Sequence, residues 1–173
     1  MNPTDSPTLM AIRIQTRQTT RSADNTAPRH VPENAAYLKQ TIGIHPMVMD
    51  RHTWESIPTG IQAWPGRTRI VVTSTPELVD EGAITATDLE EALALASAAP
   101  GGEKVWVLAG TDLDQQVLDD PRLTEVHVIT IDTRLDDREP AAELDETWVP
   151  TEVTAPTRSR NGHLYRVDRY TRR

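Results

Sequence analysis

The sequence predicts a single α/β domain in which strands alternate with helices along the chain. Residues 69–73 and 104–109 contain unbroken apolar runs, at 70–72 and 105–109, a pattern that suits strands covered on both faces of a sheet. Between them, the apolar stripe of residues 89–96 has helical spacing and predicts an amphipathic helix. Strands interleaved with helices are typical of an α/β domain.

Length and composition limit the possible classes of protein. The chain of 173 residues is long enough for one domain with a hydrophobic core and too short for two of ordinary size. It has no cysteine, which excludes disulfides, thiolate nucleophiles and cysteine-based zinc sites. Its formal net charge of −8 argues against a nucleic-acid-binding protein, because neutralising phosphates requires an excess of Lys and Arg. Since no apolar stretch could span a bilayer and the N-terminus lacks a signal sequence, we expect a cytoplasmic protein without membrane contact.

The N-terminal part is expected to contain a strand, a long loop and a helix. Residues 1–8 are polar and are expected to form a flexible arm, which leaves residues 9–173 as the domain. Residues 9–14 suit a first strand, whereas residues 15–29 lack apolar periodicity and are rich in turn-forming residues. A helix is expected to begin at Pro32, because proline is favoured in the first helical turn.

The middle of the chain contains the best-defined helix. Residues 46–49 are expected to form a short buried strand, and residues 51–57 a short helix. The segment Thr87-Asp88-Leu89-Glu90 has the pattern of a capping box, in which Thr87 and Glu90 would satisfy the free N–H groups of the first turn. Pro100, Gly101 and Gly102 would end this helix.

The strand expected at residues 104–109 runs into Gly110 and then into a helix expected over residues 112–118. A strand, a glycine and a helix in this order form a geometry that binds phosphate groups. The remaining expected elements are a strand at residues 123–131, an acidic excursion at residues 135–146 and a last strand at residues 163–170.

Charged residues are unevenly distributed along the chain. Residues 111–147 carry twelve acidic and three basic residues, whereas the last seventeen residues carry six arginines and one aspartate. We expect solvated faces that attract each other within the chain; binding of an acidic partner by the basic C-terminal segment is the alternative. The five histidines lack the spacing of a helical metal site, so no metal site is expected.

Five segments occur in the order and near the spacing seen in dihydrofolate reductases. They are PMVMDRHTWESIP, WPGRTRIVVT, DLEEALALA, VWVLAGTDLDQQVL and LTEVHV. The closing segments DETWVP and SRNGHLYRVDRYTRR are similar to those of actinobacterial members. From about Met10 to its end, the chain therefore resembles the dihydrofolate reductase family.

This resemblance implies a fold and a reaction. The fold would be a central, mostly parallel, eight-stranded mixed sheet flanked by helices. The reaction would be NADPH-dependent reduction of dihydrofolate to tetrahydrofolate, in which a hydride and a proton are added to the pterin ring in a cleft shared with the cofactor. A monomeric protein is expected.

Several positions match ligand-binding residues of the family. Arg67 falls on the arginine that binds the α-carboxylate of the folate tail, because a planar guanidinium can donate two parallel hydrogen bonds to a carboxylate. The alternative is a surface arginine that follows a turn. Thr124 matches the threonine that hydrogen-bonds to the catalytic carboxylate. The other matches are Ile12, Leu38, Ser56 and Ile57 for the substrate, and Arg51, His52, Thr53, Leu108, Ala109, Gly110 and Thr111 for the cofactor.

Other ligand-facing positions depart from the family pattern. Asn34 occupies the position of the ionisable Asp or Glu of the pterin site, and Glu33 beside it is expected to point elsewhere. Asp50 replaces a glycine before the helix that begins at Arg51, where its carboxylate can cap that helix and repel an anion. The further departures are Ala27-Pro28-Arg29 in the loop over the nicotinamide, Ala109-Gly110 for a Gly-Gly pair, Ser74 for an arginine near the adenine, Asp112 at a helix start and Asp114 for an aromatic residue.

The clustering of these departures on the ligand surface leaves two hypotheses. The first is an NADPH-dependent dihydrofolate reductase slowed by Asn34, because general acid–base assistance contributes about two to four orders of magnitude in rate. The second is a non-catalytic homologue that binds a folate or a nucleotide weakly, or that has a structural role.

Overall fold

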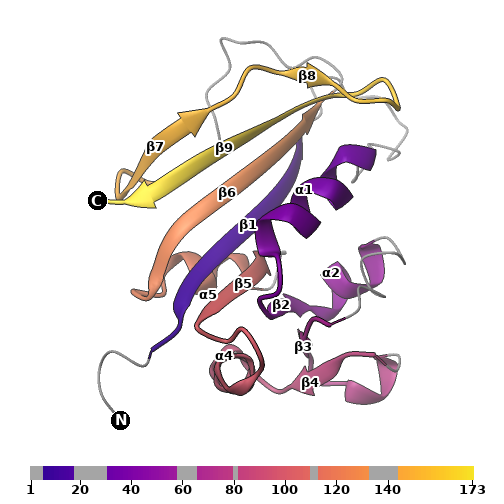
Figure 1. Cartoon of the computed structure of the whole chain (residues 1–173), viewed down its shortest axis with the longest axis vertical. Coiled ribbons are helices and arrows are strands. Elements are labelled where there is room, and N and C mark those ends of the chain that lie inside the picture. The colour runs from indigo at the N-terminus through magenta and orange to yellow at the C-terminus, as the bar shows by residue number, and fades with distance from the viewer. Residues whose placement is uncertain (1–5, 18–30, 58–65, 80–81, 110–112, 133–143) are drawn as a thin grey trace.

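A single mixed sheet organises the computed structural model, which describes residues 6–17, 31–57, 66–79, 82–109, 113–132 and 144–173 (Figure 1). In pairing order its strands are β4 (Ile84–Ala86), β3 (Arg69–Val72), β2 (Met47–Asp50), β5 (Lys104–Ala109), β1 (Thr8–Arg17), β6 (Leu123–Asp132), β9 (Leu164–Arg172) and β7 (Trp148–Val153). The two-residue strand β8 (Thr157–Arg158) pairs with β9.

Strand direction divides the sheet into two parts. The strands from β4 to β6 pair in parallel, whereas β9 pairs antiparallel with β6, β7 and β8. The expected mostly parallel mixed sheet of eight strands is confirmed, and β8 adds a short ninth strand. Because the parallel strands share one direction, their carboxyl ends lie at the same edge of the sheet.

Each face of the sheet carries its own hydrophobic core. The helices are α1 (Pro32–Ile42), α2 (Arg51–Ser56), α4 (Leu89–Ala98) and α5 (Asp114–Leu118), with a short 3₁₀ helix η1 (Pro76–Leu78). The core beneath α1 and α2 includes Met10 and Ile12 of β1, and the core beneath α4 and α5 includes Leu9 and Ala11 of the same strand. This division follows from the alternation of side chains along a strand. Within the described residues, no helix is long and apolar enough to cross a membrane.

The caps of α1 and α4 follow the sequence, with one correction. α1 ends before Gly43, whose φ of 61° carries no steric cost for glycine. The N-cap of α4 is Asp88, whose carboxylate accepts the N–H of Glu91 at 2.8 Å. The expected capping box of Thr87 and Glu90 is therefore wrong by one residue: Glu91 accepts the N–H of Thr87, at 2.7 Å. Aspartate caps a helix at least as well as threonine, so the helix starts one residue later.

The first strand is longer than expected. β1 continues through Arg13 to Arg17 because it pairs on both sides, with β5 and with β6. Residues 15–17, expected in the long loop, therefore belong to the strand. Most of the other residues expected in that loop, and most of those in the arm and the acidic excursion, lie outside the described residues.

Strand β4 was not expected from the sequence. It has only three residues, and its Ile84 is exposed, so it shows neither an apolar run nor alternation. It follows the parallel order of the sheet by pairing with β3.

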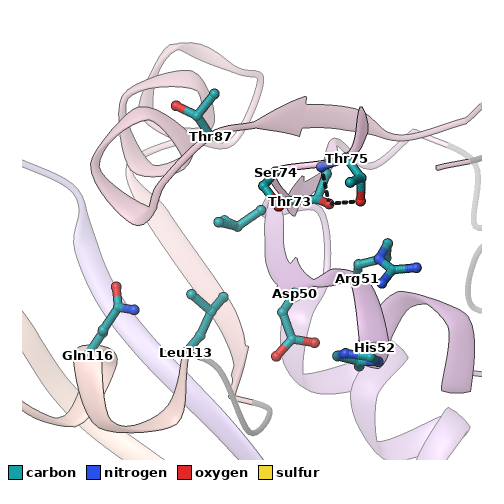
Figure 2. Close-up of a pocket in the computed structure, with 10 residues that line it drawn as sticks. Asp50, Arg51, His52, Thr73, Ser74, Thr75, Thr87, Leu113 and Gln116 are labelled. Atoms are coloured by element: carbon teal, nitrogen blue, oxygen red, sulfur yellow. Dashed lines mark hydrogen bonds between the residues drawn. The ribbon is translucent and has the colours of Figure 1, made fainter. Parts of the chain in front are cut away.

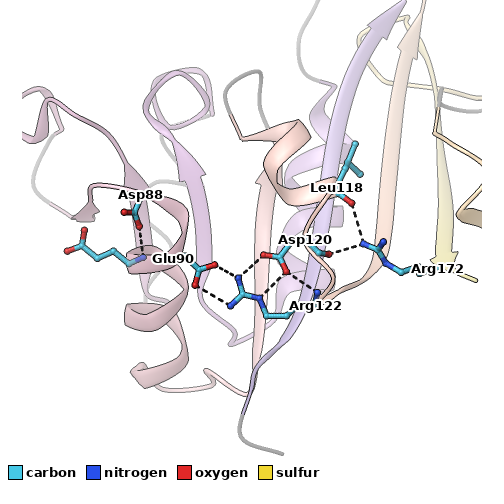
Figure 3. A network of polar contacts seen from close by, with 7 residues as sticks. Asp88, Glu90, Leu118, Asp120, Arg122 and Arg172 are labelled. Carbon is cyan, nitrogen blue, oxygen red and sulfur yellow. Dashed lines mark hydrogen bonds and ion pairs between the residues drawn. The ribbon is translucent and has the colours of Figure 1, made fainter. Parts of the chain in front are cut away.

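A network of ion pairs and hydrogen bonds ties the α5–β6 turn to α4 and β9 (Figure 3). Arg122 donates to both carboxylate oxygens of Asp120, at 2.9 and 2.7 Å, and also to Glu90 of α4. The hydrogen bond from Arg122 lowers the pKa of Asp120.

Arg172 of β9 completes this network. Its guanidinium donates to the carbonyl oxygens of Asp120 at 2.8 Å, Leu123 at 3.0 Å and Leu118 at 3.3 Å, and it lies 4.6 Å from the ring centre of Trp148. It therefore satisfies carbonyl groups at the end of α5 and stacks on an aromatic ring of β7.

Other C-terminal arginines also pair within the chain. Arg166 and Asp168 form a buried ion pair at 3.0 Å, and Arg169 lies 3.5 Å from Glu152. Arg160 lies 3.6 Å from Glu33 of α1. The acidic partners Asp168, Glu152 and Glu33 lie outside residues 111–147, so these pairs do not test the expected attraction between that acidic segment and the basic C-terminal segment.

Replacing Arg172 with methionine should destabilise the protein by about 2–3 kcal/mol, because several carbonyl groups lose a charged donor and Trp148 loses its cation. Chemical denaturation measures this change. Arg173→Met removes the same charge from an exposed side chain and should change the free energy of unfolding by less than about 0.5 kcal/mol. Equal effects of the two variants would show that the network contributes nothing specific.

Candidate functional site

Asn34 lies on the buried face of α1. Together with Leu38 and Ile42, one and two turns further on, it faces the sheet, and only 2% of its surface is exposed. Its side-chain Nδ2 is buried and has no hydrogen-bond partner within the described residues. An unpaired buried amide donor is costly, and it indicates a place where a ligand or water supplies an acceptor.

The apolar residues matched to the ligand cleft come together beside Asn34. Ile12 of β1, Leu38 of α1, Ile57 after α2 and Leu108 of β5 all belong to the core beneath α1 and α2. They come from four separate elements, which the parallel sheet brings to one face. Ser56 is matched to the same cleft, but its hydroxyl donates within α2, to the carbonyl of Thr53 at 3.0 Å.

Glu33 does not supply the missing carboxylate. Its side chain accepts from the Ser159 hydroxyl at 2.6 Å and from the Arg160 N–H at 3.0 Å. The Ser159 hydrogen bond is the main cause that lowers the pKa of Glu33. Glu33 is therefore bound to the turn between β8 and β9, as expected from its position beside the buried face of α1.

The start of α2 is capped by its own aspartate. Asp50 is 2% exposed, and its carboxylate accepts the N–H of Thr53 at 2.7 Å. Arg51 forms an i,i+4 ion pair with Glu55 at 3.1 Å, and His52 is exposed. The residues matched to the cofactor phosphates thus lie at a helix start, as expected. The carboxylate of Asp50, however, already caps this helix start, where the phosphate of a ligand would otherwise bind.

An open cleft of about 240 Å³ adjoins this helix start (Figure 2). It lies where β2 and β3 end, and α5 closes its other side. The lining residues are Asp50, Arg51, His52, Val72, Thr73, Ser74, Thr75, Thr87, Leu113 and Gln116. Their side chains are mainly hydroxyl, amide and apolar groups, with one carboxylate, one guanidinium and one imidazole.

Arg67 and Thr124 also match ligand-binding positions of the family, and they lie in different surroundings. Arg67 follows the turn at Gly66, is partly buried and donates through Nε to the carbonyl of Gly43, which joins it to the end of α1. Thr124 is exposed at the start of β6, and its hydroxyl donates to the carbonyl of Leu9 at 3.2 Å. The structure does not bring Thr124 to Asn34: Thr124 is exposed at a register shift of β6, between Leu123 and Val126, which both belong to the core beneath α4 and α5.

Asp114 pairs with a strand residue at the carboxyl edge. Its carboxylate lies 3.2 Å from the guanidinium of Arg13 in β1, and Arg13 pairs with Ala109 at the end of β5. Burial raises the pKa of Asp114, and Arg13 partly opposes this shift.

The matched or substituted residues Ala27, Pro28, Arg29, Gly110, Thr111 and Asp112 lie outside the described residues.

A hydrogen-bonded trio centred on the buried His127 was not expected from the sequence. The Tyr37 hydroxyl lies 2.5 Å from Nδ1 of His127, and Nε2 of His127 bonds to the Glu125 carboxylate. A neutral imidazole with its proton on Nε2 satisfies both contacts, accepting from Tyr37 and donating to Glu125. Trp106 packs edge-on against the same ring, with 5.1 Å between ring centres. The trio links α1, and so Asn34, to β6.

No group of three or more His, Cys, Asp or Glu side chains that could hold a metal ion occurs in the described parts of the chain.

The sequence of this chain matches the model of a known protein family. A family model described as dihydrofolate reductase matches residues 8–172. This chain belongs to the dihydrofolate reductase family. Members of this family are NADPH-dependent oxidoreductases that act on folate.

Individual dihydrofolate reductases agree with this assignment. The protein from Mycobacterium leprae is 36% identical over 129 residues, which cover 73% of this chain and 75% of the relative. The protein from Neisseria meningitidis is 33% identical over 152 residues, or 87% of this chain and 89% of the relative. The Mycobacterium tuberculosis protein is 32% identical over 149 residues, covering 84% and 86%. The mycobacterial relatives confirm the resemblance to actinobacterial dihydrofolate reductases.

The buried trio predicts a pH-dependent contribution to stability. Burial lowers the pKa of His127 below its usual value of 6.5, although the bond to Glu125 opposes this shift. The unfolded chain therefore binds a proton more readily, and stability is lost as the pH falls from about 6.5 towards the lower folded-state pKa. Because glutamine can also donate to Glu125 and accept from Tyr37, His127→Gln should remove this loss.

Denaturation at several pH values between about 7 and 5 tests this expectation. The parent should lose more stability than His127→Gln over this range. His163→Gln, in the turn before β9 and outside the trio, should behave like the parent. Parallel curves for the parent and His127→Gln would contradict the neutral, buried imidazole.

Proposed function

We propose that this chain is a cytoplasmic, monomeric dihydrofolate reductase that uses NADPH and is slowed by the amide at position 34. The observation that carries this proposal is Asn34 itself: it is 2% exposed and lies on the face of α1 that joins the apolar residues of the cleft. This buried location supports the match of Asn34 to the ionisable residue of the pterin site, but asparagine carries no charge.

The reduction of dihydrofolate adds a hydride to a ring carbon and a proton to the neighbouring nitrogen. A buried carboxylate would favour the protonated ring, whereas an amide can hydrogen-bond to the ring but carries no charge. Since Glu33 is bound to Ser159 and Arg160, it does not replace the charge. The loss of general acid–base assistance should cost about two to four orders of magnitude in rate.

The remaining residues would bind and orient the ligands. Ile12, Leu38 and Ile57 form apolar walls that exclude water from the ring, and Arg67 would bind the carboxylate of the folate tail. The cofactor would be held by Arg51 and His52 at the start of α2 and by Leu108 and Ala109 at the end of β5. When bound, NADPH supplies the hydride.

A non-catalytic family member is the second candidate, and two carboxylates favour it. Asp50 caps α2 where a cofactor phosphate would approach, and Asp114 stands at the carboxyl edge beside Arg13. Both would repel an anionic ligand. Such a protein would bind a folate or a nucleotide weakly and turn over neither.

Asn34→Asp should raise the rate of NADPH oxidation with dihydrofolate by about two orders of magnitude or more, because it restores an ionisable group at the buried position. The loss of NADPH absorbance measures this rate. Asn161→Asp makes the same chemical change in an exposed turn and should leave the rate unchanged. Thermal melting of each variant checks that the chain is folded.

The outcomes separate the two candidates. A measurable parent rate that rises in Asn34→Asp supports the slow reductase. A folded Asn34→Asp variant that remains inactive at high protein concentration contradicts it. If NADPH also fails to shift the melting temperature of either protein, the non-catalytic candidate is favoured.

A further inference from the structure

The hydroxyl-lined cleft lies at the correct distance from Asn34 to hold the far end of a dinucleotide. The cleft is formed where β2 and β3 end, and α1, which carries Asn34 on its buried face, packs on the core that includes Ile12 of β1. Three strand intervals separate β3 from β1 in the order β3-β2-β5-β1. At a spacing of about 4.8 Å this is roughly 14 Å, which an extended dinucleotide can span. With its reactive ring beside α1, its adenosine half would reach the cleft.

The charges around the cleft are unfavourable for an additional phosphate. Among the described residues that line it, the one guanidinium belongs to Arg51, which is ion-paired with Glu55 at 3.1 Å, and His52 adds an imidazole. The buried Asp50 carboxylate lines the same cleft (Figure 2). In dinucleotide sites, an arginine accommodates a ribose 2′-phosphate, whereas a carboxylate suits a free 2′-hydroxyl.

One hydroxyl group of the cleft, that of Thr87, cannot donate to an anion. Thr87 donates its hydroxyl proton to the Glu91 carboxylate at 2.6 Å, so its oxygen can offer the cleft only an acceptor. Glu91 lies directly behind Thr87, and its pKa is lowered by the Thr87 hydrogen bonds, so it is ionised near neutral pH. On the β3 side, Thr73 accepts the N–H of Thr75 at 3.0 Å, which fixes a second hydroxyl-bearing wall.

We propose that this cleft takes an adenosine ribose with a free 2′-hydroxyl, so that the 2′-phosphate adds nothing to the binding of NADPH and NADH serves equally well or better. The proposal rests on the proposed function for the orientation of the dinucleotide. It makes Asp50 and Thr87 the residues that determine cofactor specificity.

Nucleotide fragments test the cleft without any hydride chemistry. Calorimetric titration with adenosine 5′-monophosphate and with adenosine 2′,5′-bisphosphate compares a free hydroxyl with a phosphate at the same position. We expect the monophosphate to bind at least as tightly. Binding of the bisphosphate more than about tenfold tighter, or no binding of either fragment at high concentration, would overturn the proposal.

An added cation should reverse the preference. Ser74→Arg places a guanidinium at the cleft, where it can bind a phosphate bidentately, and should favour the bisphosphate by about tenfold or more. Ser97→Arg adds the same charge at an exposed position on α4 outside the cleft and should leave the ratio unchanged. Equal ratios in the two variants would show that the ribose does not lie in this cleft.

The proposed function and this proposal can fail separately. If the parent binds both fragments as expected but shows no reductase activity, the function fails and the specificity of the cleft stands. If the parent reduces dihydrofolate with NADPH at least tenfold better than with NADH, judged by kcat/KM, the function stands and the specificity fails.

Discussion

The parallel pairing of β2, β5, β1 and β6 is the constraint on which the rest of the structure depends. It places the carboxyl ends of four strands at one edge, where α2 directly follows β2. The start of α2, the end of β5 and the buried face of α1 meet only because these strands share one direction. Without this parallel pairing, Ile12, Ile57 and Leu108, which come from different parts of the chain, would not pack in the same core.

The hydrophobic cores of this chain and the sheet edge at which ligands are proposed to bind differ in the kind of contact that their side chains make. The two cores retain apolar residues at alternating strand positions, as packing requires. At the ligand-facing edge, by contrast, polar groups bind to each other: Asp50 caps α2 and Asp114 pairs with Arg13. These internal contacts satisfy groups that would otherwise be available to a ligand, so the fold does not need a ligand for local stability.

Much of the fold could be predicted because periodicity and turn chemistry are local. The apolar run of β5 and the proline at the start of α1 led to the right elements. The N-cap of α4 was misplaced by one residue because Thr87 and Asp88 are both good caps, and it is the Asp88 carboxylate that accepts the N–H of Glu91.

Contacts between distant residues could not be predicted in the same way. Tyr37 and His127 are 90 positions apart, and nothing local in either segment indicates that they meet. The position of Asn34 came from the family resemblance and not from periodicity. Thr124 was matched in the same way, but it is exposed at a register shift of β6, which a local pattern does not reveal.

The orphan amide of Asn34 also determines hydrogen-bond polarity. A carboxylate presents two acceptors to a flat ring, whereas an asparagine side chain presents one acceptor and one donor side by side. A heterocycle whose edge carries two N–H groups can satisfy only half of this pair, while an edge with a bare ring nitrogen beside an amino group satisfies both halves. If a heterocycle binds beside Asn34 as proposed, this side chain would discriminate between tautomers and between neutral and cationic rings, and a ligand that binds as a protonated base would find no counter-ion in Asn34.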